Sequence, residues 1–305
     1  MRFLSIGVNE YTNDSIEYLI SQLNDLKQKK IKIRTTLVKV PQSRFIICKL
    51  NENRILSSLN DHSFIALKQY TAFILSDYII KYHEDKLLGR IINMNYCYFS
   101  KPEKKKILDL AISFLKSNED SIKFNLYNAK RKNLIFRKLL EYFESNNEII
   151  IDGFVNFRIK EYFKELEDTV DKAVDAFLME REYQEFIKLL RYFVEIQEPK
   201  LEAVHIFSSY DSKYIILDHF HNEITNECIK EFLNEVPNED INYDDLLVSS
   251  LITIAPIRIY IHCAKQIRNK ELLETIKNVF VNKVIFCNGC DLCKMNNVGI
   301  ESLTK

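Results

Sequence analysis

The chain has 305 residues and carries 43 basic and 43 acidic side chains, so its formal net charge is zero. Its hydrophobic fraction of 47% is enough to build a core and excludes a wholly disordered chain. A protein that wraps nucleic acid normally carries a basic excess, which this composition lacks. The five glycines lie far apart, so neither a phosphate-binding loop nor a nucleophile elbow can be written.

The sequence shows neither an export signal nor a membrane span. The apolar run at the N-terminus is short and is followed by Glu10, and the longest uncharged stretch, residues 246–257, falls short of the ~20 residues that cross a bilayer. We therefore expect a cytoplasmic protein without a membrane span. In that reducing compartment its seven cysteines are thiols or metal ligands.

We expect a predominantly helical α+β fold. Residues 1–100 are predicted to form a small α+β unit that runs into helices. Alternating or helical spacing of the apolar residues indicates a strand at 2–8, a helix from about 14, a hairpin of 31–40 with 44–50, and a helix over 62–96.

Residues 101–200 are predicted to form a central helical region, with helices at 103–117 and 122–145. Eleven basic residues face only four acidic ones between Lys101 and Leu140, with a peak at residues 129–138. One interpretation is a surface that contacts phosphate backbones. The other, which we favour, is the solvated side of an amphipathic helix, because Leu134 and Leu139 lie between the charges.

The block from residue 155 to 199 shows two apolar stripes at helical spacing. The stripe that runs from Leu166 to Phe177 is displaced by more than a third of a turn from the one that runs from Tyr183 to Val194. Either the helix breaks near residues 179–182, or one long helix is covered first on one side and then on another. The second half is apolar nearly all round, which predicts central burial and a carboxylate or carbonyl partner for Arg191.

Residues 201–293 are predicted to form a C-terminal α/β unit, and 294–305 a tail. A hairpin is expected at 202–207 and 213–218, and helices at 223–236 and 246–255. The unit should close with a strand at 257–262, a helix at 271–280 and a strand at 283–287. Such a βαβ unit places its two strands parallel, with a right-handed crossover.

The three cysteines of FCNGCDLCK, at positions 287, 290 and 293, are the most specific chemical pattern. Because parallel neighbours end at the same sheet edge, Cys287 should lie near His262 and Cys263. Either of the latter could join Cys287, Cys290 and Cys293 as fourth ligand of a tetrahedral zinc ion. The pattern also matches part of an iron–sulfur run, although its fourth cysteine and following proline are missing.

Two further interpretations of these thiols stay open. The cysteines could be idle thiols without a metal, or a redox pair with a resolving third thiol. Elsewhere, the helix that carries the first stripe has three aspartates that could bind a metal, Asp168, Asp171 and Asp175, but a solvated helix face explains them better. The histidines of LDHFHNE, His219 and His221, could also bind a metal, but a role in capping the following helix explains them better. The lone Cys48, Cys97 and Cys228 are predicted to be small core residues.

The segments GFVNFRIKEY, VDKAVDAFLMEREYQEFIKLLRYFVEIQEPK, EAVHI, KYIILD, DDLLVSSLITIAP and CNGCDLC resemble the YtxC-like family of sporulation proteins. The resemblance spans Gly153 to Cys293. It implies an intracellular protein of an endospore-forming bacterium, linked to spore formation. It implies no biochemical activity and assigns no catalytic or binding residues.

Three functions follow from these observations. The first is a non-catalytic protein that binds an unknown partner protein during sporulation, which the missing enzyme motifs favour without excluding an enzyme. The second is a metalloprotein that holds zinc or an iron–sulfur centre through CxxCxxC. The third, nucleic-acid binding through the basic residues of 129–138, is not expected from a neutral chain.

Overall fold

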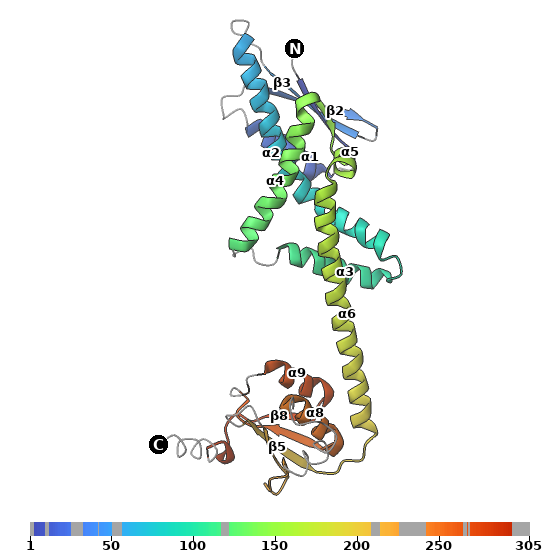
Figure 1. The fold of residues 1–305 in the computed structure, drawn as a ribbon, viewed down its shortest axis with the longest axis vertical. Coiled ribbons are helices and arrows are strands. Elements are labelled where there is room, and N and C mark those ends of the chain that lie inside the picture. Colours follow the sequence, from blue (N-terminus) through green and yellow to red (C-terminus); the bar gives the residue numbers. More distant parts are fainter. Residues whose placement is uncertain are drawn as a thin grey trace. The chain divides into compact units, whose positions relative to one another are not determined.

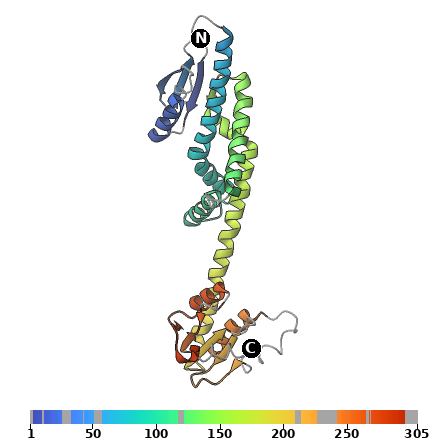
Figure 2. The same cartoon turned by 90° about the vertical axis from the view of Figure 1, so that its left-hand side faces the viewer.

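The computed structural model describes residues 3–9, 12–25, 33–41, 43–50, 57–116, 122–208, 214–225, 242–264, 267 and 269–294 (Figures 1 and 2). The fold is predominantly helical α+β, as predicted. Contacts between residues divide the chain into two compact units, Met1–Leu178 and Met179–Lys305. The finer division at residues 100, 200 and 293 stays a prediction.

The first unit contains a four-stranded sheet in the order β2-β3-β1-β4. The hairpin of β2 (Ile33–Val40) and β3 (Ser43–Leu50) is confirmed, and β1 (Phe3–Val8) lies antiparallel to β3. The short β4 (Glu148–Ile150) lies parallel to β1. Its three residues are too few to show an alternating pattern, so the sequence alone does not indicate this strand.

Helices supply the rest of the first unit. In chain order they begin with α1 (Asn13–Asp25), α2 (Ser57–Asn95), α3 (Lys101–Lys116), α4 (Ile122–Ser145) and α5 (Ile151–Arg158). Figures 1 and 2 both show α2 and α4 side by side. The apolar faces of the sheet and helices meet in one core, which includes Leu4, Ile6, Leu19, Leu75, Tyr78 and Leu139.

The basic peak of the sequence lies on helix α4. Arg131 is buried and forms an ion pair with Glu84 of α2. Lys132 Nζ lies 2.7 Å from the carboxylate of Asp77, and Lys130 Nζ lies 3.1 Å from that of Glu165. Helix α4 is thus amphipathic, as predicted, but Arg131 departs from the expected solvated side, because it is buried with Ile135 and Leu139 and paired with Glu84.

The long helix α6 (Lys160–Ile196) runs without a break through the point where its apolar stripe changes side. In its first half the predicted stripe is buried in the core of the first unit: Leu166, Val170, Ala173, Val174 and Phe177. In its second half Ile187 and Val194 are buried in the core of the second unit. Of the two interpretations, one continuous helix covered on two different sides is therefore correct.

The predicted central burial of the second half of α6 is wrong. Phe186 is 53% exposed and Phe193 is 42% exposed, since the core of the second unit covers only the side that carries Ile187 and Val194. The expected partner of Arg191 is present, because its Nη2 donates to the carbonyl of Asn278 at 2.7 Å.

The second unit contains a four-stranded sheet in the order β6-β5-β7-β8. The predicted hairpin is confirmed as β5 (Ala203–Ser208) with β6 (Tyr214–Leu217). The closing βαβ unit is confirmed as β7 (Arg258–Ile261), α9 (Lys270–Val279) and β8 (Val284–Phe286), with β7 and β8 parallel. Helix α8 (Tyr243–Ile254) precedes β7 and packs into the same core.

Local sequence explains where the two helices of this unit begin and end. The side chain of Asn269 accepts hydrogen bonds from the backbone of Glu271 and Leu272, which caps α9. Helix α8 ends at Ile254, and the left-handed backbone of the following Ala255 (φ 46°) closes the last turn before Pro256. Most of the predicted helix 223–236, Cys228 and the tail from 295 lie outside the described residues. Among the described helices, none has the length and apolar composition that a bilayer crossing requires.

Candidate metal centre

The CxxCxxC segment begins where β8 ends. Strand β8 is in register with β7, so that Ile261 is opposite Phe286, and the next residues of the two strands are His262 and Cys287. The backbone N–H of Cys287 donates to the carbonyl of Ile261 at 2.9 Å and extends the pairing by one bond. The predicted meeting of His262 and Cys287 at one sheet edge is thus a consequence of the parallel pairing.

Two backbone features fold the three cysteines into one loop. Gly289 has φ of +120°, a conformation that a side chain would strain, and its N–H lies 3.4 Å from Cys287 Sγ. Residues 291–294 form a helical turn, in which the N–H of Lys294 donates to the carbonyl of Cys290. The loop therefore turns back, and Cys290 and Cys293 face the same point as Cys287.

The donor atoms of His262, Cys287, Cys290 and Cys293 all lie within 4.8 Å of one another. Cys293 Sγ is 3.7 Å from the sulfurs of both Cys287 and Cys290. His262 Nδ1 is 3.3 Å from Cys293 Sγ and 3.5 Å from Cys290 Sγ. In a tetrahedral zinc site with Zn–S of ~2.3 Å, neighbouring sulfurs stand ~3.8 Å apart and a nitrogen stands ~3.6 Å from each sulfur.

Cys263 lies at the edge of this cluster. Its thiol interacts electrostatically with those of Cys293, Cys287 and Cys290, while its backbone adopts a left-handed conformation with φ of 50°. Burial, followed by the neighbouring thiols, raises the pKa of Cys263 to about 11. Of the two residues that the sequence offered as fourth donor, His262 is the one in the tightly spaced set, and Cys263 contacts it from outside.

Electrostatics suit His262 and Cys293 to metal binding. Burial, and then the neighbouring His205 and His221, lower the pKa of His262 to about 4, so its imidazole is neutral near pH 7. Burial raises the pKa of the Cys293 thiol, but hydrogen bonds from Cys290 and the adjacent thiols outweigh it and leave that pKa lowered. A neutral imidazole and a readily ionised thiol are the protonation states that coordinate a metal.

Sequence reasoning missed His205, which lies behind His262. Its Nδ1 is 3.0 Å from His262 Nε2, and its ring stacks on Tyr260 with the two planes 9° apart. Phe207 stacks on His262 with centroids 4.3 Å apart. His205 and Phe207 are two positions apart on β5, a spacing that places them on the same face of the strand and that the sequence shows. The sequence did not show that β5 also pairs with β7, which carries the chain to His262.

The other candidate ligands do not join the cluster. The three aspartates of α6, Asp168, Asp171 and Asp175, are exposed, as predicted. His219 and His221 lie in the turn after β6, where the Asp218 carboxylate accepts two backbone N–H groups. Among the lone cysteines, Cys48 is buried as predicted, whereas Cys97 is exposed, contrary to prediction, because it lies just beyond the end of α2.

Comparisons with known proteins place the chain in a family. The sequence profile of the YtxC-like family matches residues 69–285, which is more than half of the chain. The "uncharacterized protein YtxC" of Bacillus subtilis (strain 168) is 27% identical over 223 residues, which cover 72% of this chain and 76% of the relative. No solved structure matches.

The matched range includes His205 and His262 but ends before Cys287. It also begins well upstream of Gly153, where the resembling motifs start, so the resemblance extends into α2 of the first unit. The chain belongs to the YtxC-like family.

Proposed function

We propose that the second unit of this protein is a metal-binding module that holds one zinc ion through Cys287, Cys290, Cys293 and His262. The observation that carries the proposal is the sulfur spacing of 3.7 Å, which is close to the edge of a zinc-centred tetrahedron. An iron–sulfur cluster of several irons would hold its cysteines farther apart, because each sulfur binds a different iron.

The zinc ion in this proposal is structural. Three thiolates and one imidazole fill the four positions of the tetrahedron, and no position is left for a substrate or a reactive water. Its contribution is to join the ends of β7 and β8, so metal binding and folding of this unit are coupled. This agrees with the expectation of a non-catalytic protein in a reducing cytoplasm.

Metal analysis of the full chain, purified without chelator under reducing conditions, tests the proposal. We expect one zinc per chain, no visible absorption, and thiolate-to-cobalt bands after exchange for Co²⁺. Cys290→Ser and Cys293→Ser should lose the metal, while the matched Cys97→Ser, which alters an exposed thiol outside the cluster, should keep it. A metal-free wild type overturns the proposal, and a brown preparation with iron and sulfide replaces zinc by an iron–sulfur centre.

We further propose that the protein acts in spore formation by binding a partner protein through α6. The supporting observation is a stripe of exposed large apolar side chains at intervals of three and four residues: Phe186, Leu189, Phe193 and Ile196. These are between 42% and 58% exposed. The interval is that of a seam that packs against a second helix.

We expect the α6 stripe to bind an amphipathic helix of another protein, with a basic residue at one end of that helix. The reason is Glu182, which continues the same spacing four residues before Phe186. In a parallel pairing of two copies the two Glu182 carboxylates would face each other. In an antiparallel pairing Glu182 would face Ile196. Both arrangements bury an uncompensated charge, so a second copy is disfavoured.

Site-specific photo-crosslinking tests this surface. A photoreactive residue at position 189 should crosslink one partner during sporulation, at a helix with apolar residues three and four apart. The same residue at 195, exposed on another side of α6, should not. In Bacillus subtilis lacking YtxC, wild-type chain but not Leu189→Lys should restore heat-resistant spores. Equal crosslinking from both positions, or a purified homodimer that Leu189→Lys dissociates, overturns the proposal.

A further inference from the structure

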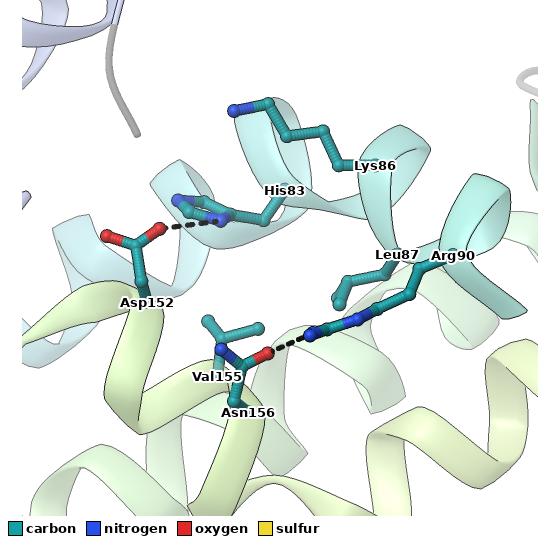
Figure 3. A pocket seen from close by; sticks show the side chains of 7 residues that line it. All are labelled: His83, Lys86, Leu87, Arg90, Asp152, Val155 and Asn156. Atoms are coloured by element: carbon teal, nitrogen blue, oxygen red, sulfur yellow. Dashed lines mark hydrogen bonds and ion pairs between the residues drawn. The ribbon is translucent and has the colours of Figure 1, made fainter. Parts of the chain in front are cut away.

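A groove of about 280 Å³ lies in the first unit, between α2 and α5. Helix α2 lines it with one face, spaced three and four residues apart: His83, Lys86, Leu87 and Arg90. Helix α5 lines it with Asp152, Val155 and Asn156, which have the same spacing. Figure 3 shows these seven side chains, with Leu87 and Val155 between a polar pair at each end.

One end of the groove lies beside the carboxyl ends of two parallel strands. Strands β1 and β4 are parallel neighbours, and Asn9 follows one while α5 follows the other directly. The N–H of Asn9 donates to Asp152 Oδ2 at 2.8 Å, which joins the two strand ends. Although the rest of the sheet is antiparallel, this pair has the parallel arrangement whose carboxyl ends commonly border ligand sites in α/β proteins.

The polar groups of the groove are predominantly basic. Lys86 and Arg90 are exposed at its rim, and His83 is buried, with Nδ1 3.9 Å from Asp152 Oδ1. Among the described residues of the lining Asp152 is the acidic one, and its carboxylate accepts from the Asn9 N–H and lies beside the His83 ring. Arg90 Nη1 donates to Asn156 Oδ1 at 2.6 Å, and this bond fixes the orientation of the guanidinium. The bond uses one of the five N–H groups that a guanidinium carries.

We propose that this groove binds a small organic anion, a molecule with one phosphate or carboxylate group and a short apolar part. Arg90 takes the anionic group, because its fixed guanidinium forms charge-assisted hydrogen bonds with such oxygens, and the exposed Lys86 adds positive charge at the rim. The buried Leu87 and Val155 form an apolar floor for the remainder. The volume of about 280 Å³ limits the ligand to a small molecule.

Calorimetric titration of the full chain at low ionic strength tests the proposal, with butyl phosphate, valerate and inorganic phosphate as probes. We expect at least one of the organic anions to bind one per chain and more tightly than inorganic phosphate. The arms with butyl phosphate and valerate tell a phosphate ligand from a carboxylate. Arg90→Gln and Lys86→Gln should each weaken binding about tenfold or more, and Arg90→Lys should fall between Arg90→Gln and wild type.

Lys106→Gln is the matched control, since it removes an exposed cation from α3, away from the groove lining. It should bind as wild type does. Absence of binding by wild type overturns the proposal, as does equal binding by Arg90→Gln, Lys86→Gln and wild type. The groove belongs to the first unit, so its result is independent of metal analysis of the second.

Discussion

His205 Nδ1 lies 3.0 Å from His262 Nε2, so one proton is shared between two imidazoles in the second unit. A His262 that binds a metal through Nδ1 must carry its proton on Nε2, from which it donates to His205. The contacts of His262 Nδ1 with Cys290 and Cys293 fit this assignment. His205 therefore positions the ring and fixes its tautomer, as partners of metal-binding histidines commonly do.

Replacement of this positioning residue, His205→Ala, should weaken zinc binding about tenfold to a hundredfold without abolishing it. Competition with a chromophoric chelator measures the affinity. His205→Gln should retain part of it, since its amide oxygen can accept from His262 Nε2, and His219→Ala should match wild type. The Co²⁺ spectrum distinguishes positioning from general damage, because only a shifted His262 alters the ligand field. Unchanged affinity and spectrum in His205→Ala would contradict the assignment.

Removal of the metal should destabilise the second unit and leave the first unchanged. Amide hydrogen exchange measures this, since the N–H of Cys287 bonds to Ile261 at the metal loop while that of Ile6 pairs within β1 and β3. A chelator should speed exchange at Cys287 and its neighbours and leave Ile6 unaffected. Equal exchange rates with and without chelator would show that the loop folds independently of metal.

Arg131→Ala should destabilise the first unit by about 3–5 kcal/mol, because it leaves the Glu84 carboxylate buried without its cation. Tyr162 Oη also donates to that carboxylate, at 2.5 Å, but a neutral donor replaces only part of the charge. Urea unfolding measures the difference. Lys130→Ala is the control, since its side chain is 70% exposed and its pair with Glu165 contributes less than about 1 kcal/mol.

If the loss in Arg131→Ala comes from the unpaired Glu84, then Glu84→Gln in the same chain should restore part of the stability. If Arg131→Ala and Lys130→Ala unfold at the same urea concentration, the buried ion pair contributes no more to the free energy of unfolding than the exposed pair does.

Two glycines of the first unit should respond oppositely to alanine. A Cβ on Gly7 would lie 2.8 Å from the Phe45 ring, so Gly7→Ala should cost about 1–3 kcal/mol through overpacking. Gly89 lies inside α2 with nothing within 4 Å of its Cβ position, so Gly89→Ala should stabilise by about 0.5–1 kcal/mol. Thermal unfolding of both variants checks the signs, and destabilisation by Gly89→Ala would contradict this account of α2.

Elements with a clear period were predictable from the sequence. The hairpin of β2 and β3, the closing βαβ unit and the change of side in α6 all follow from apolar spacing, and the structure contains them. The three-residue β4 was not predictable, because its partner β1 is more than 140 residues away and supplies the reason for the strand. The exposure of Phe186 was missed for a related reason, since spacing shows which residues are apolar but not how many sides are covered.

The candidate metal centre was predictable only in part, because some of its residues belong to elements with clear local patterns and others do not. The local patterns of β7 and β8 were enough to predict their parallel pairing, and this pairing places His262 beside Cys287. His205 could not be found that way, because its neighbourhood depends on β5 lying beside β7. Likewise, the groove between α2 and α5 joins residues that are distant in sequence and have no shared motif.

The two ends of the donor set are 31 residues apart in sequence, and helix α9 lies between them. A metal bound to His262 and Cys293 therefore closes a chain loop that contains this helix, and closing it removes conformational freedom from the unfolded state. We therefore expect α9 to detach from the sheet less often when a metal is bound, so that amide exchange in this helix reports on the ion.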